Sequence, residues 1–468
     1  MNNITDWLTH VTGDPFADIG GLVIEYLQEK RSDKSITNLI EYATNIYVNQ
    51  WDNNIHSFFL NSTITHNSNK GQKGIDKTIT YYRGLLNGDN SVEGYCRITG
   101  QKTKVFPGAR DNHIMSGSAT LINFHHGFEK GILLSKEVLI RIFFVPLGVE
   151  QLGDKVSILI SNNEDVTRYF VRKNIDRNLK SLGSNMSKSI LHSDFSNPAS
   201  AIFDYAGQCI ENVITATYDK EKNRSNTSGI TLNLYHFTNF GASPTIILLT
   251  LQATIFAFYY YCLIYYKKDW QNFILRQYTN SKYKNATYDS YSNTWHNNKE
   301  KVDYSNYKIW YNRVYEALLK DNATVVRRAF LRHNKDYALN FNIVEQYQIN
   351  IRNMDKRTLS KIKELANFII TDSSDVEIIK SITIINRQKS SSELRRYLLK
   401  LVAEYNRKHG DNPKPLVTID EYADYLFPDG SYWSEIRDLL LIAIYQKLHE
   451  LNKKVDVELS EEETENAN

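Results

Sequence analysis

The sequence of 468 residues predicts an α+β protein, with a mixed N-terminal domain over residues 1–323, a C-terminal α-helical bundle over residues 324–454 and an acidic, disordered tail over residues 455–468. Three observations support this prediction. Residues 231–237 alternate as a half-buried strand does. Beyond residue 324, apolar side chains recur at helical spacing. Six of the last thirteen residues are acidic, which is typical of a solvated tail.

The chain opens with a predicted helix. Asp14 is a preferred N-cap residue, and Pro15 suits the first helical position. Apolar residues follow at three- and four-residue spacing as far as Leu27. Gly20 and Gly21 lie within this helix and lower its intrinsic stability, so we expect another segment to pack closely against them.

An uncharged run of 22 residues, Thr245 to Tyr266, has two interpretations. We expect a buried strand from Ile246 to Leu251, followed by a core helix from Ala253 to Tyr266. The alternative is a transmembrane helix, because the run is long enough to span a bilayer. The threonines and five tyrosines within it are unusual for the centre of a span, and no second such run is found in the sequence.

The helices expected beyond residue 324 have recognisable starts. Ser390–Glu393 and Thr418–Glu421 are capping boxes, and the last helix is expected from about Ser431 to Leu451. The first of these helices carries a basic cluster, which consists of Arg327, Arg328, Arg332, His333 and Lys335.

Residues 267–315 interleave lysine and arginine with tyrosine and tryptophan. Cations beside aromatic rings are typical of proteins that bind single-stranded nucleic acid. A polar linker of biased composition explains the same pattern and is the interpretation that we favour.

The overall charge gives a weak indication of the partner. The chain has 56 basic and 53 acidic residues, but without the six acids of the tail the basic residues are nine in excess. Such an excess favours a polyanionic partner, although an ordinary mildly basic protein explains it equally well.

Cys96, Cys209 and Cys262 are too few and too far apart for a disulfide framework, which fits a reduced, cytoplasmic setting. Residues 1–7 do not resemble a signal peptide.

No catalytic motif is found in the sequence, whether a glycine-rich phosphate loop, a zinc-protease motif or a serine-hydrolase motif. His125 and His126 are the one adjacent pair of histidines, and no partner for a metal site can be identified for them. We therefore expect no catalytic residue, no metal and no cofactor, and predict that the chain is not an enzyme. The alternative is a nuclease with a degenerate active site.

Five short patterns occur in order along nearly the whole chain, at Gly13–Gly21, Cys96–Gly100, Asn123–Gly148, Tyr235–Pro244 and Trp433–Tyr445. Together they resemble the large subunit of type I-B CRISPR surveillance (Cascade) complexes, in the CXXC–CXXC branch.

The sequence departs from that branch at its cysteines. Thr99 stands where the first Cys-x-x-Cys would end, and residues 134–137, where the second is expected, contain no cysteine. A tetrahedral zinc site needs about four ligands, and one is left. We expect no zinc, and expect packing and hydrogen bonds to hold the loop instead.

The resemblance implies an adaptor without catalytic activity in a ribonucleoprotein. The implied partners are a CRISPR RNA, target double-stranded DNA, the other CRISPR effector subunits (backbone, RNA-end-binding and small subunits) and a helicase-nuclease recruited on target binding, with no membrane. The large subunit would read a short motif beside the target, the PAM, while base pairing reads the target itself.

Motif reading needs side chains that reach base edges, with phosphate contacts that position them. The expected nucleic-acid-binding residues are Lys102, Lys104, Arg110, Asn112, His113, Asn123, His125 and His126 after the Cys96 loop, and Arg327 and Arg328 in the helical region. An ordinary solvated role is the alternative for each of them.

In related systems the C-terminal part is also made separately by internal initiation. A start at Met354 would give a product of 115 residues, and a single band from a C-terminally tagged gene would contradict this hypothesis.

Overall fold

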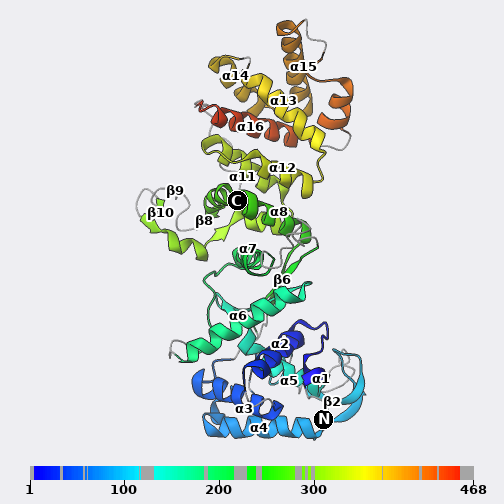
Figure 1. Ribbon diagram of the computed structural model, residues 1–468, viewed down its shortest axis with the longest axis vertical. Coiled ribbons are helices and arrows are strands. Elements are labelled where there is room, and N and C mark those ends of the chain that lie inside the picture. The colour runs from blue at the N-terminus through cyan, green and yellow to red at the C-terminus, as the bar shows by residue number, and fades with distance from the viewer. Residues whose placement is uncertain are drawn as a thin grey trace. The chain divides into compact units, whose positions relative to one another are not determined.

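The computed structural model divides into two compact units, which join in the sequence between Gln252 and Ala253 (Figure 1). The first unit mixes helices with small sheets and the second is mainly helical, which confirms the predicted α+β class. The division at residue 323 and the disordered tail stay predictions. The structure describes residues 5–31, 35–55, 58–60, 62–114, 116, 131–183, 188–214, 229–238, 245–279, 287–289, 294–296, 301–371, 373–410, 414–428 and 432–453.

The first unit contains two antiparallel sheets among helices. Its helices are α1 (Thr5–Thr9), α2 (Pro15–Lys30), α3 (Ile36–Asn45), α4 (Gln72–Asn87), α5 (Lys136–Phe144), α6 (Glu164–Gly183) and α7 (Pro198–Cys209). The smaller sheet has the order β1 (Val92–Tyr95), β2 (Lys102–Gly108), β3 (Ile132–Ser135). The larger sheet has the order β4 (Glu150–Leu152), β5 (Lys155–Ser161), β6 (Leu232–Thr238), β7 (Thr245–Leu251).

Helix α2 begins as its sequence predicts. The Asp14 carboxylate accepts a hydrogen bond of 2.8 Å from the Ala17 amide, and Pro15 is the first helical residue. At Gly20 a Cβ atom would lie only 1.9 Å from the carbonyl oxygen of Arg141 in α5. The two helices therefore touch backbone to backbone, which confirms the close packing expected at the paired glycines.

Helix α5 forms the centre of the core, since Val138 to Phe144 are all buried. The Tyr47 hydroxyl donates a hydrogen bond of 2.9 Å to the Phe143 carbonyl oxygen. The Phe143 ring also packs against Tyr82, with ring centroids 4.5 Å apart. This aromatic cluster satisfies the buried hydroxyl, and α5 packs between α2 and the smaller sheet.

The larger sheet confirms two predictions and corrects one. Strand β6 occupies the predicted alternating segment, and β7 is followed by α8 (Ala253–Tyr265), as expected for a strand leading into a helix. The prediction that this strand is buried is wrong, because Ile246, Ile247 and Leu248 are 47%, 42% and 53% exposed. The reason is that β7 is the last strand of the sheet, and among the described strands only β6 pairs with it. None of the helices in the described ranges has the length and hydropathy of a membrane span.

In the second unit the last helix, α16, packs against both α11 and α13 (Figure 1). The helices of this unit are α8, α9 (Lys267–Leu275), α10 (Arg313–Leu319), α11 (Ala323–Asp336), α12 (Phe341–Asn350), α13 (Lys356–Thr371), α14 (Asp375–Asn386), α15 (Ser391–Lys408) and α16 (Trp433–Glu450). Short strands stand between α9 and α10: β8 (Tyr278–Thr279), β9 (Thr287–Asp289), β10 (Thr294–His296), β11 (Lys301–Asp303) and β12 (Tyr311–Asn312). Met354 lies just before α13, and its use as a start stays a prediction.

The helix caps of this unit agree with those predicted from the sequence, with one difference at Ser390. Thr418 and Glu421 form a capping box, because each side chain accepts a hydrogen bond from the other's amide. Ser390 caps α15 through the Glu393 amide, but the Glu393 carboxylate binds the amide of Lys389 instead of that of Ser390.

The polar linker that we favoured for residues 267–315 is not what the described part of this segment shows. Trp270 and Phe273 of α9 are almost fully buried, and so is Trp310. These residues therefore belong to a packed core. Its apolar side chains are spaced among lysines and tyrosines in the sequence.

Candidate nucleic-acid interface

The hairpin β1–β2 presents the first group of predicted residues. Lys102 and Lys104 are two positions apart on β2 and therefore share a face. The antiparallel register places Tyr95 opposite Lys102 and Glu93 opposite Lys104. Both lysines are exposed and make no ion pair with a described residue, and Tyr95 is 61% exposed. The hairpin thus carries two available cations beside an exposed aromatic ring, with Glu93 reducing the local charge.

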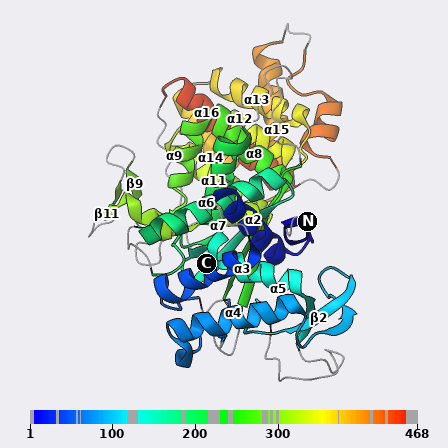
Figure 2. The same cartoon turned by 60° about the horizontal axis from the view of Figure 1, so that its bottom comes forward.

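The hairpin is backed by a helix. Figures 1 and 2 show β2 beside the end of α4, where Lys104 lies next to Gly88. Arg110, just after β2, is half-buried and also lacks an ion pair with any residue in the described ranges. A rigid hairpin with free cations can bind a phosphate backbone, because its side chains need no rearrangement of the main chain.

Asn112 and His113 point inward. The Asn112 amide accepts from Ala109 N at 2.7 Å and donates to the Tyr81 hydroxyl at 2.8 Å and the Pro107 carbonyl at 3.1 Å. His113 is buried with its Nδ1 at 2.5 Å from the Ser116 hydroxyl, and burial lowers its pKa to about 4. It is therefore neutral near pH 7 and offers no charge to a phosphate. Asn123, His125 and His126 lie outside the described residues.

The loop between β1 and β2 is held by the lone Cys96. Its thiol is buried, which raises the thiol pKa, but hydrogen bonds from the Thr99 hydroxyl and from the amides of Thr99, Ser135 and Ile98 outweigh burial and lower the pKa below its usual value. Ser135 lies in the segment where the second Cys-x-x-Cys is expected. The Arg97 amide, next to Cys96, donates a hydrogen bond of 2.9 Å to the Leu133 carbonyl, which connects this loop to β3.

This arrangement gives a testable prediction. Cys96→Ala is expected to destabilise the first unit by about 1–3 kcal/mol, because it removes a buried thiol that stabilises the loop. Cys96→Ser should cost less, since a hydroxyl also accepts hydrogen bonds. At Cys209, where burial alone raises the thiol pKa to about 12, the order should reverse, because serine buries a hydroxyl where alanine does not. Thermal unfolding of the four variants checks this, and the same order at both sites would contradict it.

In the second unit the two predicted arginines differ. The Arg327 guanidinium is 9% exposed and donates to the Asp438 carboxylate at 2.7 Å, so it connects α11 to α16. Arg328 is exposed and shares a helix face with Arg332 and Lys335, at spacings of four and three residues. None of these three exposed cations forms an ion pair with a described residue. Arg327 is occupied within the fold, and Arg328 is available to a partner.

A second basic face on α15 was not predicted. Arg396, Lys400 and Arg407 are four and eleven positions apart, are exposed, and make no ion pair within the described ranges. Their spacing was visible in the sequence. The apolar stripe of the same helix is the stronger signal in this segment.

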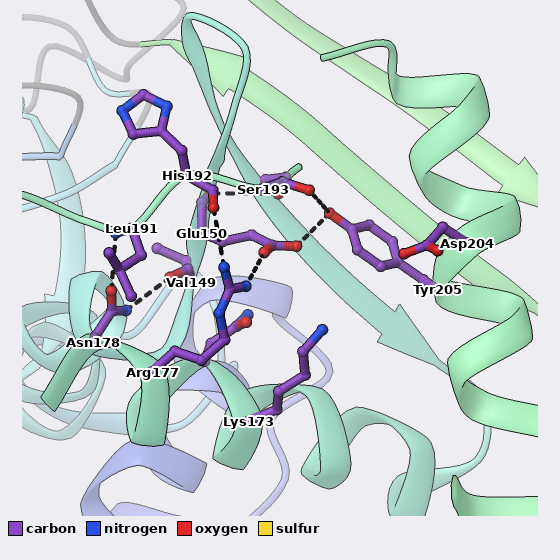
Figure 3. Close-up of polar contacts among 12 residues, drawn as sticks. Val149, Glu150, Lys173, Arg177, Asn178, Leu191, His192, Ser193, Asp204 and Tyr205 are labelled. Atoms are coloured by element: carbon purple, nitrogen blue, oxygen red, sulfur yellow. Dashed lines mark hydrogen bonds and ion pairs between the residues drawn. The ribbon is translucent and has the colours of Figure 1, made fainter. Parts of the chain in front are cut away.

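A group of titratable side chains around Glu150 connects three elements of the first unit (Figure 3). The Glu150 carboxylate is 5% exposed and receives hydrogen bonds from Arg177 of α6, at 2.8 Å, and from the Tyr205 hydroxyl of α7. Arg177 also donates to the His192 carbonyl at 3.0 Å, and Lys173 donates to Gln208 at 2.5 Å. These groups satisfy one another, as expected for an interior network that joins β4 to two helices. Among the described residues, no three histidine, cysteine or acidic side chains are placed to hold a metal ion.

The comparison with protein families concerns the helical end of the chain. The family model of the DevT C-terminal domain matches residues 333–468, from the last turn of α11 onward. DevT is a Cas8-like, CRISPR-associated family, so the chain carries a C-terminal domain that fits a CRISPR-associated function. No curated protein matches the chain.

Proposed function

We propose that this chain is the large subunit of a CRISPR RNA-guided DNA surveillance complex of type I-B, in the CXXC–CXXC branch, and that it acts in the cytoplasm without catalytic activity. Its partners would be a CRISPR RNA, the target duplex, the other effector subunits and a helicase-nuclease recruited once the target is bound. The match of the DevT C-terminal domain to residues 333–468 is the observation that carries this proposal.

The distribution of free cations supports nucleic acid as the ligand. Arg168 and Arg177 of α6 are ion-paired with Glu25 and Glu150, whereas Lys102 and Lys104 have no such partner in the described part of the chain. An unpaired cation loses little by binding a phosphate, because no internal interaction has to be broken. We therefore assign duplex contacts to Lys102, Lys104 and Arg110 and leave Asn112, His113 and Arg327 to their structural roles.

The test is salt-dependent binding of a target duplex by the assembled complex. Lys102→Glu together with Lys104→Glu is expected to weaken binding and to reduce the slope of log affinity against log salt by about two, since each phosphate contact contributes ~0.9. Lys73→Glu together with Lys188→Glu is the matched control, because both lysines are exposed and the change in net charge is the same. Equal losses in the two double variants would show a general charge effect and would contradict the assignment.

Affinity purification of the tagged chain tests the assembly itself. Short RNAs of uniform length, recovered with other CRISPR subunits, are the expected result. Recovery of the chain without RNA would contradict the proposal. Metal-dependent cleavage of DNA that is lost on substitution of the chain's own acids would establish a nuclease instead.

A further inference from the structure

The outer edge of strand β7 lacks the usual protection of a sheet edge. Strand β7 pairs with β6 over its full length, from Thr245 opposite Thr238 to Leu251 opposite Leu232, without a bulge. It contains no charge, proline or glycine. Proteins commonly protect an exposed edge with such residues or with a bulge, because free amides and carbonyls pair readily with another strand.

The opposite edge of the same sheet shows how this protein closes an edge with its own chain. Strand β4 has only three residues, and the segment after α6 covers it. The Gln151 amide donates to the Leu191 carbonyl at 2.9 Å, and the Ser193 amide donates to the Gln151 carbonyl at 2.7 Å. No described residue makes corresponding hydrogen bonds with the outer edge of β7.

The side chains of β7 indicate what kind of partner fits. Ile246 and Leu248 project from one face and Ile247 from the other, and all three are more than two-fifths exposed. Free backbone groups along a strand select an extended polypeptide. Because the strand carries no charge, an uncharged partner strand matches it without burying an unpaired ion.

The small area argues against a second copy of this chain. Seven residues of strand extend over ~23 Å at ~3.3 Å per residue, and only three large apolar side chains are available along them. A stable dimer buries about 800 Å² on each partner. A short segment of a protein that is held nearby by other contacts needs no such area.

We propose that the outer edge of β7 binds an extended, uncharged segment of a partner protein, which adds a fifth strand to the four-stranded sheet and places apolar side chains beside Ile246, Ile247 and Leu248. This inference is independent of nucleic-acid binding, since it depends only on the strand edge.

Hydrogen exchange of the full chain tests the proposal with a defined probe. The probe is a soluble peptide of alternating threonine and valine with lysine at both ends. It should slow exchange of amides in residues 245–251 by about tenfold or more, because it pairs with them. The same peptide methylated at alternate amide nitrogens cannot donate those hydrogen bonds and should give no protection.

Two variants test whether protection depends on the edge of β7 and not on the stability of the fold. Ile246→Lys with Leu248→Lys places two charges on the edge and should abolish protection while leaving the melting temperature unchanged, because both side chains are already about half exposed. Val376→Lys, at a position 74% exposed on α14, is the control and should bind the peptide as the unmodified chain does. Three results would overturn the proposal. The first is that millimolar peptide gives no protection. The second is protection without peptide that increases with protein concentration, which would indicate a second copy. The third is protection in the dilute chain alone, which would indicate that its own residues cover the edge.

Discussion

Replacement of Asp438 by alanine is expected to destabilise the helical unit by about 3–5 kcal/mol, because it removes the carboxylate bound at 2.7 Å to the buried Arg327 guanidinium and leaves only the Glu435 carboxylate, at 4.0 Å. Asp438 is 2% exposed on α16. One of its carboxylate oxygens accepts from Arg327 at 2.7 Å, and the other accepts from Arg437 at 2.9 Å. Hydrogen exchange of α11 and α16 should accelerate together in the variant, since this ion pair joins the two helices.

Two further variants make this prediction specific. Asp375→Ala removes an exposed ion pair with Lys453 at 3.2 Å and should cost no more than about 1 kcal/mol. Arg327→Met combined with Asp438→Leu should recover much of the lost stability, because it removes the buried guanidinium together with its carboxylate. Arg437, which also loses Asp438, is partly exposed and keeps its hydrogen bond of 3.0 Å to the Gln388 carbonyl. A loss for Asp438→Ala no larger than that for Asp375→Ala would show that the buried pair is not important for stability.

Gly20→Ala is expected to destabilise the first unit by about 3 kcal/mol, although alanine is the better helix former by ~1 kcal/mol. The added Cβ would lie 1.9 Å from the Arg141 carbonyl oxygen, so α2 and α5 would have to separate along their contact. A backbone atom cannot move aside as a side chain can. Hydrogen exchange of the α2 and α5 amides at increasing denaturant measures the effect, because these amides belong to the first unit.

Gly84→Ala is the control for this prediction. Gly84 is also within a helix, but a Cβ there would meet the Asp89 carboxylate at 3.2 Å, and that side chain can rotate away. The control should therefore be neutral or slightly more stable than the original chain. Similar losses at Gly20 and Gly84 would show that the contact between α2 and α5 is not the cause.

Sequence signals identified features that depend on near neighbours. The cap at Asp14, the box at Thr418 and strand β6 are each determined by a few consecutive residues, and all three are confirmed. The segment Thr245–Tyr265 was correctly divided into strand and helix for the same reason.

Features that depend on distant residues could not be predicted. Arg327 looked like a surface cation, because its partner Asp438 is 111 positions away. Strand β7 looked buried, because a continuous apolar run does not reveal whether a strand lies in the middle or at the edge of a sheet. Likewise, Glu150 stands in no motif, and its role depends on helices α6 and α7, which contribute Arg177 and Tyr205.

The unprotected strand edge has a consequence for how the cell must supply this protein. A chain whose β7 edge is uncovered presents an uncharged strand to other copies, and such edges favour aggregation. Quality-control proteases and chaperones remove chains that expose surfaces of this kind. If a partner segment covers this edge as proposed, the amount of usable protein depends on the supply of that partner, and co-production of the two should raise the yield of the intact chain.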